Sequence, residues 1–191
     1  ARLYDPSHEI LNLEDYRRRH QQYKLDPDLQ AVHQQHPFFH TWDDHETAND
    51  AWRDGADNHD EGEGEYADRK AAAFQAYREW MPFREQEEEG KLWRKFDFGD
   101  LAQLTMLDTR HWGRDEQSEM DDESRSLLGA DQEAWFAEQM SESTAQWQII
   151  GQQVMLGQLY APNTDDVLVP LNYDQWDGYQ AARGRLYEAI R

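Results

Sequence analysis

Helices are predicted along much of the chain from the spacing of its apolar residues. The clearest pattern lies between residues 73 and 81, where apolar side chains recur every three or four positions until Pro82. Residues 130–140 repeat this pattern, and a last helix is predicted from about Tyr173 onward. Because each segment has one apolar face, each is expected to pack against a core.

Two shorter helices are predicted near the start of the chain from residues that favour helix ends. Asn12 is a suitable N-cap for the first, and acidic residues follow it in the first turn, where they favour the helix dipole. Pro27 is pre-organised for the first position of the second helix, which Pro37 ends. Leu29 and Val32 are expected on the inner face of this second helix.

Strands are predicted where aromatic and branched residues form short runs. Residues 91–98 and 101–108 flank Gly99-Asp100, a pattern typical of an antiparallel hairpin. Three further strands are predicted, at residues 38–42, 147–150 and 154–159. Helices and strands alternate without internal repeats, so the fold class is α/β or α+β.

Two polar stretches separate these elements, one from Thr47 to Glu65 and one from Gly113 to Ser124. The first is long for a loop in a compact domain, and loops of this length are usually functional or mobile. It follows directly on the acidic segment that ends the predicted strand 38–42. We therefore expect a functional site where that strand meets the loop.

Composition indicates a folded domain that is strongly acidic. A length of 191 residues suits one domain. Aromatic residues make up 13% of the chain, including 8 Trp, and are enough to form a core. The net charge of −21 repels nucleic acids and anionic membranes, so we expect no nucleic-acid partner. No segment approaches the roughly 20 apolar residues of a membrane span, so stable membrane insertion is not expected. The absence of Cys excludes disulfides and thiolate chemistry within the chain.

The segment Asp43-Asp44-His45-Glu46 is the main candidate for chemistry. Adjacent carboxylates repel one another unless a cation or an arginine compensates their charge. A bound cation would use their oxygens as ligands, and His45 could bind metal or donate a proton. Asn49 and Asp50 could add further oxygen ligands, one neutral and one charged, although a pair of turn residues explains them as well. An exposed acidic turn with a surface histidine explains the same residues equally well.

Asp108 and Arg110 form a second candidate, because they follow the apolar strand 101–107. An aspartate and an arginine at a strand end can orient a ligand histidine or hold an oxyanion. An internal ion pair is the competing interpretation. The basic island Arg17-Arg18-Arg19 could contact a phosphate, but three successive helical residues face three directions, so most are expected in ion pairs.

Six blocks of sequence resemble the PhoD-like alkaline phosphatase/phosphodiesterase family, in the family's order and across nearly the whole chain. They are Leu13–Tyr23, His36–Glu46, Ala76–Arg84, Met106–Arg110, Leu128–Gln132 and Trp176–Tyr179.

The resemblance implies a calcineurin-like metallophosphoesterase fold, with two mixed sheets flanked by helices and metals at the strand ends. It implies a secreted or periplasmic enzyme that hydrolyses phosphate mono- and diesters, which are small-molecule partners, with iron and calcium. Asp44 would then bind metal, and His45 would stabilise the transferring phosphoryl group. Asp43 and Asn49 belong to the same motif and are further metal candidates. Asp108 and Arg110 would contact these residues and hold them in position without binding the metal themselves.

The family's first and last metal motifs, both Gly-Asp strand ends, do not occur in this sequence. Residues 1–191 are therefore expected to be the central part of one metallophosphoesterase domain, incomplete at both ends, with a partial active site. This leaves a second hypothesis open, in which the chain is a non-catalytic acidic module that binds cations or a partner. Neither hypothesis predicts the oligomeric state.

Overall fold

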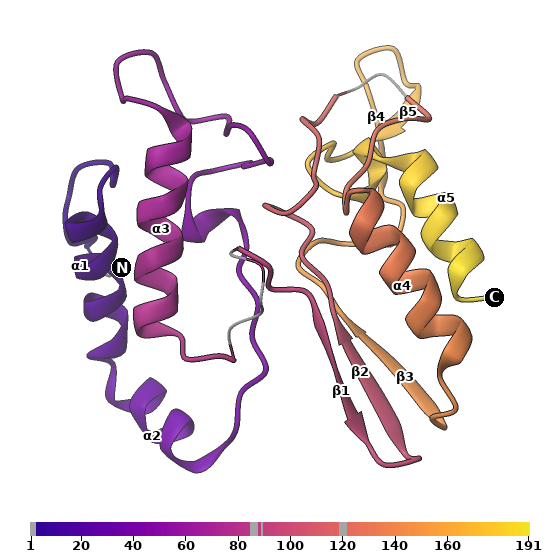
Figure 1. The fold of residues 1–191 in the computed structure, drawn as a ribbon. Helices are drawn as coiled ribbons and strands as arrows, with labels where there is room; N and C mark the ends of the chain where they lie inside the picture. Colours follow the sequence, from indigo (N-terminus) through magenta and orange to yellow (C-terminus); the bar gives the residue numbers. More distant parts are fainter. Residues whose placement is uncertain (1–2, 85–87, 89, 119–121) are drawn as a thin grey trace.

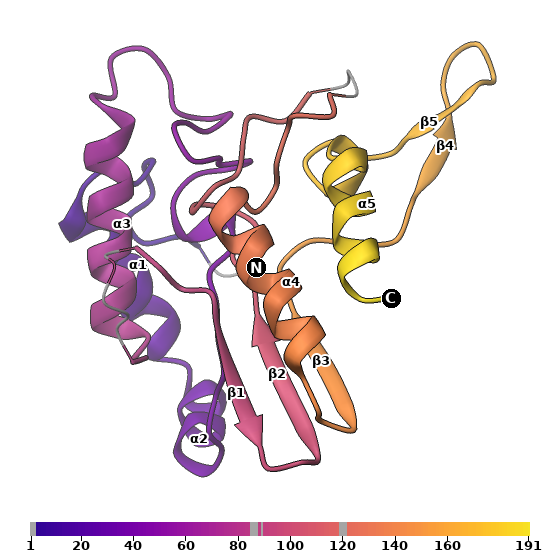
Figure 2. The same ribbon diagram turned by 45° about the vertical axis from the view of Figure 1, so that its right-hand side comes forward.

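The structure is a computed structural model that describes residues 3–84, 88, 90–118 and 122–191. Three helices from the first half of the chain lie on one side, and a small sheet with two helices lies on the other (Figures 1 and 2). The extended segment before residue 44 and the loop after residue 106 meet between these two parts, and this junction carries the acidic segment. Residues 119–121 of the loop predicted at 113–124 lie outside the described residues.

The first two helices begin where the sequence predicts. α1 spans Leu13–Lys24, and the Asn12 side chain accepts a hydrogen bond from the Asp15 amide at 3.2 Å. α2 spans Pro27–Gln35 behind the N-cap Asp26. Leu29 is half-buried and lines a cavity with residues of α1, as expected for the inner face, whereas Val32 is 39% exposed and α2 has no buried residue. α2 packs against α1 at the edge of the molecule (Figure 1).

α3 spans Tyr66–Trp80 and packs along α1. It begins directly after the polar stretch predicted as loop, seven residues before Ala73, the first residue of the apolar pattern. Arg69 explains the difference, because its buried guanidinium pairs with Glu9 at 2.9 Å and Glu63 at 3.3 Å. The added turns are therefore held by ion pairs, which apolar spacing does not reveal.

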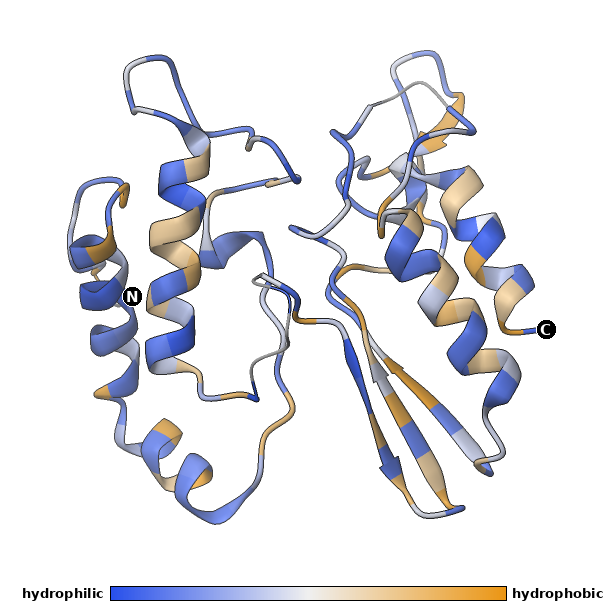
Figure 3. Cartoon of the chain, in the orientation of Figure 1, coloured by the Kyte–Doolittle hydropathy of each residue, from blue (hydrophilic) through white to orange (hydrophobic). Residues whose placement is uncertain are grey.

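A three-stranded mixed sheet forms the centre of the second part. β1 (Arg94–Phe98) and β2 (Ala102–Met106) form the predicted antiparallel hairpin, with Phe96 opposite Leu104. β3 (Trp147–Gly151) pairs in parallel with β2, so the strand order is β1-β2-β3. β2 alternates between apolar and polar residues (Figure 3).

Two of the predicted strands do not form. Residues 38–42 are extended but pair with no other strand among the described residues, and their aromatic side chains pack against rings of other segments. Phe39 contacts Phe96 at 4.5 Å between ring centroids, and Trp42 contacts Phe74 at 4.7 Å. Residues 154–159 form no strand either, and the short hairpin of β4 (Tyr160–Pro162) and β5 (Leu168–Pro170) follows them.

The main core lies between the two C-terminal helices and the loops that leave the sheet. α4 spans Ala130–Glu142 and supplies Phe136, while α5 spans Gln180–Ala189 and supplies Leu186. The last helix begins later than predicted, because residues 172–179 form turns and the 3-10 helix η2 (Trp176–Gly178). Trp176 is fully buried there, and its indole N–H donates to the Gln152 side chain at 3.0 Å.

The described residues confirm a mixed α/β fold, with five α-helices, a three-stranded sheet and a separate two-stranded hairpin. No helix among these residues is both long enough and apolar enough to cross a membrane.

A close backbone approach between Gly113 and Gly129 holds the loop after β2 against the start of α4. A Cβ atom at Gly113 would press on the Cα of Gly129 and lie 2.6 Å from the Leu128 carbonyl oxygen. We expect Gly113→Ala to lower the free energy of unfolding by about 1–3 kcal/mol, because backbone on both sides must move. Urea denaturation measures this, with Gly157→Ala as the control because a Cβ there meets nothing within 4 Å. Equal midpoints for the two variants would contradict it.

Candidate metal centre

Asp44 lies at the bottom of an acidic cleft, where the chain turns sharply after its extended run. It begins the 3-10 helix η1 (Asp44–Glu46) and is 2% exposed. One carboxylate oxygen accepts the amide N–H of Asp50 at 2.7 Å, and the other lies 2.9 Å from Nδ1 of His45. The Asp43 amide donates to the Glu46 carboxylate at 2.6 Å, which closes the turn. The predicted strand is absent, but the turn still brings the acidic segment to one place.

His45 extends from this turn into the open cleft. Its side chain is 78% exposed, while Nδ1 faces Asp44 at 2.9 Å and Asp43 at 4.0 Å. The Asp44 carboxylate also accepts the His45 backbone N–H at 2.9 Å, so it lies beside one ring nitrogen and leaves the other open to a ligand. Nε2 of His45 is therefore the ring atom available to a molecule in the cleft.

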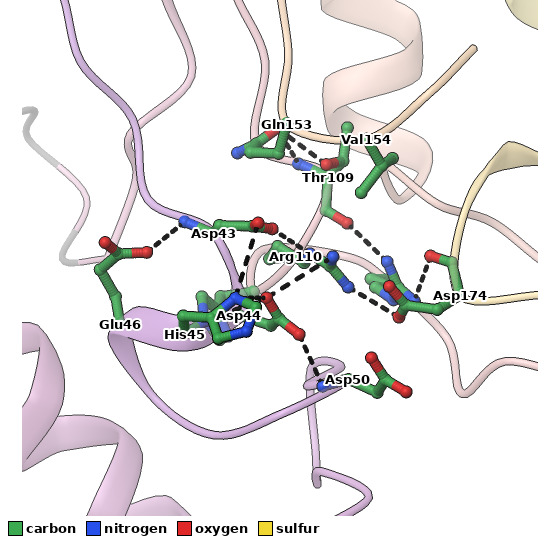
Figure 4. A network of polar contacts seen from close by, with 12 residues as sticks. Asp43, Asp44, His45, Glu46, Asp50, Thr109, Arg110, Gln153, Val154 and Asp174 are labelled. Carbon is green, nitrogen blue, oxygen red and sulfur yellow. Dashed lines mark hydrogen bonds and ion pairs between the residues drawn. The ribbon is translucent and has the colours of Figure 1, made fainter. Parts of the chain in front are cut away.

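Arg110 joins three carboxylates at the same place (Figure 4). Its Nε donates to Asp43 at 2.6 Å and its Nη1 to Asp174 at 2.7 Å, and Nη2 lies 3.6 Å from Asp44. Burial by itself would lower the pKa of Arg110, but the hydrogen bond and charge of Asp174, with the charges of Asp43 and Asp44, raise it. Arg110 is therefore the fixed positive charge of the cleft.

Asp174 is a site residue that the sequence did not predict. It is 8% exposed and accepts hydrogen bonds from Arg110 and from the fully buried Arg114. Its carboxylate, with those of Asp44 and Asp50, offers oxygen atoms that all lie within 4.8 Å of one another. Asp174 lies just outside the family block Trp176–Tyr179 and is 130 positions from Asp44 in the chain, so its place beside Asp44 is revealed by the fold.

Asp50 has an unusual backbone conformation and an unusual environment. Its φ of 51° lies in the left-handed region, which aspartate tolerates better than most residues. Burial raises the pKa of its carboxyl group, and the nearby charges of Asp174 and Asp44 raise it further. A carboxylate crowded by like charges in this way favours a bound cation.

The cleft itself is an open cavity of about 560 Å³. The four predicted residues Asp43, Asp44, His45 and Asn49 line it, together with Arg110 and the two further acids. Asn49 is exposed at its rim. The structure therefore brings all but one of the predicted site residues together around one cavity.

Asp108, the remaining one, lies behind the cleft and is fully buried. One carboxylate oxygen accepts the amide N–H groups of Arg110 and His111, each at 2.9 Å. Burial raises the pKa of Asp108, and the two amide donors oppose this effect. Asp108 thus shapes the turn that carries Arg110, and the described contacts place its carboxylate on these amides rather than on His45.

His111 is a second residue that sequence reasoning missed. Its Nε2 lies 3.1 Å from the Thr47 hydroxyl, and its carbonyl accepts a hydrogen bond from Lys70 at 2.9 Å. Burial lowers the pKa of His111 well below its usual value, with smaller contributions from Lys70 and Arg110, so the ring is neutral. It connects the loop after β2 to the turn that presents His45.

Comparison with known proteins identifies the family. The family model described as PhoD-like phosphatase matches residues 1–191. The chain belongs to the PhoD-like phosphatase family. Alkaline phosphatase D of Bacillus subtilis (strain 168) is 37% identical over 199 residues, covering 97% of this chain and 33% of that protein. A solved structure described as "Structure of PhoD" matches with a TM-score of 0.85 and 35% identity, over 96% of this chain and 37% of that chain. The chain thus spans about a third of the length of these PhoD-like relatives.

Removal of the Arg110 charge should reveal how strongly the carboxylates repel. We expect Arg110→Gln to lower the free energy of unfolding by about 3 kcal/mol, because it leaves the buried Asp174 and Asp44 with less compensating charge. Added Ca²⁺ should raise the melting temperature of this variant more than that of the wild type, since the cation replaces the lost charge.

Differential scanning calorimetry with and without Ca²⁺ measures both effects. Arg191→Gln is the matched control, because the Arg191–Glu188 pair is exposed at the surface and such pairs contribute about 0–1 kcal/mol. An Arg110 variant that behaves like this control would show that the carboxylates do not need the arginine.

Proposed function

We propose that this chain is the central part of a metal-dependent phosphoesterase that hydrolyses phosphate monoesters and diesters. The observation that carries the proposal is the buried Asp44 carboxylate, which holds the exposed His45 ring at 2.9 Å inside an acidic cavity. Membership of the PhoD-like phosphatase family supports the same reaction.

Hard cations suit the oxygen atoms of this cavity. Asp44, Asp50 and Asp174 supply one set of oxygens within 4.8 Å of one another, and carboxylate oxygens of Asp43 and Asp44 with a ring nitrogen of His45 form a second group. We assign Asp44 as a metal ligand, with Asp43 and Asn49 as further candidates. A bound cation supplies Lewis-acid activation of a phosphate oxygen. We propose iron and calcium, the pair that the family resemblance implies.

Three other side chains of this protein act on the phosphoryl group or position the residues that do. His45 lies at the cavity edge with Nε2 free, where it can donate a hydrogen bond or a proton to an oxygen of the phosphoryl group. Arg110 fixes the positions of Asp43 and Asp174 and offsets part of their charge. Asp108 holds the backbone amides at Arg110 and His111 and so keeps this guanidinium in place.

The finer architecture and the location of the enzyme are also proposals. We propose that the three-stranded sheet belongs to a calcineurin-like sandwich of two mixed sheets, of which residues 1–191 form the central part. The large exposed side chains of β3 support further packing on this sheet, because Trp147 is 62% and Ile149 51% exposed. We propose a secreted or periplasmic location from the family resemblance.

The rival hypothesis of a non-catalytic acidic module is not favoured. An acidic surface alone does not require a buried carboxylate that orients a histidine, nor an arginine ion-paired to two acids of the same cavity. The family match over residues 1–191 likewise points to an enzyme.

The decisive experiment measures hydrolysis of p-nitrophenyl phosphate and bis(p-nitrophenyl) phosphate by the full-length protein loaded with iron and calcium. We expect His45→Ala to lower kcat about 100-fold or more, as for loss of an acid catalyst. Asp44→Ala should abolish activity, because it removes both a ligand and the partner of His45. Asp97→Ala is the control, since Asp97 is an exposed acid on β1. Full activity in the Asp44→Ala, His45→Ala double variant would refute the assignment.

A further inference from the structure

A second cavity begins at His45 and runs away from the acidic cleft toward α1 and α2. It has a volume of about 410 Å³, and its walls include the His45 and Glu46 side chains. Aromatic and basic side chains of α1 and the preceding segment form the rest of the wall, among them Tyr4, Tyr16, Arg19, Tyr23 and Lys24. We call this cavity the basic groove. Because His45 also lines the acidic cleft, a ligand that extends past His45 can enter both.

Of the three successive arginines on α1, only Arg19 lines the basic groove. Arg17 makes two hydrogen bonds to Glu79, each 2.6 Å, and Arg18 pairs with Asp5, so carboxylates offset both charges. Arg19 instead donates to the backbone carbonyls of Asp5 and Pro6. Its charge lies over the Tyr4 ring, 4.7 Å from the centroid, and lines the groove.

Lys24 is the second cation of the groove and the more available one. Within the part of the chain that the structure describes, its ammonium group makes no ion pair with a carboxylate. Partial burial lowers the pKa of Lys24, which is the effect of a charge held without such a partner. Among the described residues, Lys70 also lines a cavity without an ion pair, but its ammonium group donates to the carbonyls of Arg53 and His111, each at 2.9 Å.

The other titratable groups of the groove leave its charge positive. Burial and the charge of Lys24 lower the pKa of His20 to about 4, so this ring is neutral near pH 7. Glu46 is the carboxylate among the lining residues, and its oxygen already accepts the Asp43 amide. His33 stacks on Phe38 at 4.2 Å between ring centroids.

We propose that the basic groove binds a second anionic group of the substrate, a phosphate on the part of a phosphodiester that lies beyond the reacting phosphorus, with Lys24 as its charged contact. The inference rests on the proposed function, because it takes His45 as the residue next to the reacting phosphate. A diester held there must extend out of the cleft. The groove that starts at His45 offers that extension two cations and stacking surfaces, whereas the cleft walls around Asp43, Asp44 and Asp174 repel anions.

A matched pair of substrates tests the inference in the full-length, metal-loaded protein. Thymidine 5′-(p-nitrophenyl phosphate) and the same diester with a 3′-phosphate release the same chromophore and differ only in the second anion. We expect the 3′-phosphorylated diester to have a KM about tenfold lower at similar kcat, as one charge-assisted contact allows. Lys24→Gln should remove this difference. Lys95→Gln should retain it, because that lysine is on β1, at the surface.

The possible outcomes separate this inference from the proposed function. Hydrolysis of both diesters with equal KM, or a preference that survives Lys24→Gln, overturns the second-anion site and leaves the phosphoesterase intact. If neither diester is hydrolysed, the proposed function fails. Titration calorimetry with thymidine 5′-phosphate and thymidine 3′,5′-bisphosphate then tests whether the groove binds the second phosphate. Tighter binding of the bisphosphate to the wild type but not to Lys24→Gln supports the anion site, and equal binding overturns it.

Discussion

One guanidinium holds together a set of carboxylates that would otherwise repel each other. Asp44, Asp50 and Asp174 place oxygen atoms within 4.8 Å of one another, in a chain whose net charge is −21. Arg110 reaches Asp43 and Asp174 at hydrogen-bond distance and lies near Asp44. Without this charge the segment before η1 and the turn before η2 would separate, since buried like charges are costly. The same crowding is the physical basis of the cation site proposed above.

The position of Arg110 depends in turn on the sheet and on α4. Asp108 accepts the backbone amides of Arg110 and His111, and Gln132 of α4 holds the backbone of Asp108 through two hydrogen bonds of 2.8 Å. The main core packs α4 against this loop through apolar contacts. The hydrophobic energy of the core thus fixes the polar turn, and the polar turn fixes the guanidinium. A site built in this way keeps its geometry because its supports are buried.

Local sequence patterns predicted much of the fold, where local physics decides. The Asn12 cap, the proline at the start of α2 and the Gly99 turn of the hairpin all lie where predicted, because capping and turn geometry involve neighbouring residues. The pattern was misleading where tertiary contacts compete with it. The aromatic run 38–42 resembles a strand, but its rings pack on Phe74 and Phe96 and no ladder forms.

The sequence by itself determined the acidic segment at Asp43 to His45, the adjacent Asn49 and the pair Asp108 and Arg110, because each carries a compact local pattern or a family motif. Only the tertiary structure decided which charges meet. Asp174 joins the cleft from 64 positions after Arg110, and Lys24 reaches the groove at His45 from another helix. Charge in a folded chain acts through space over a few ångströms, and sequence separation carries no information about that distance.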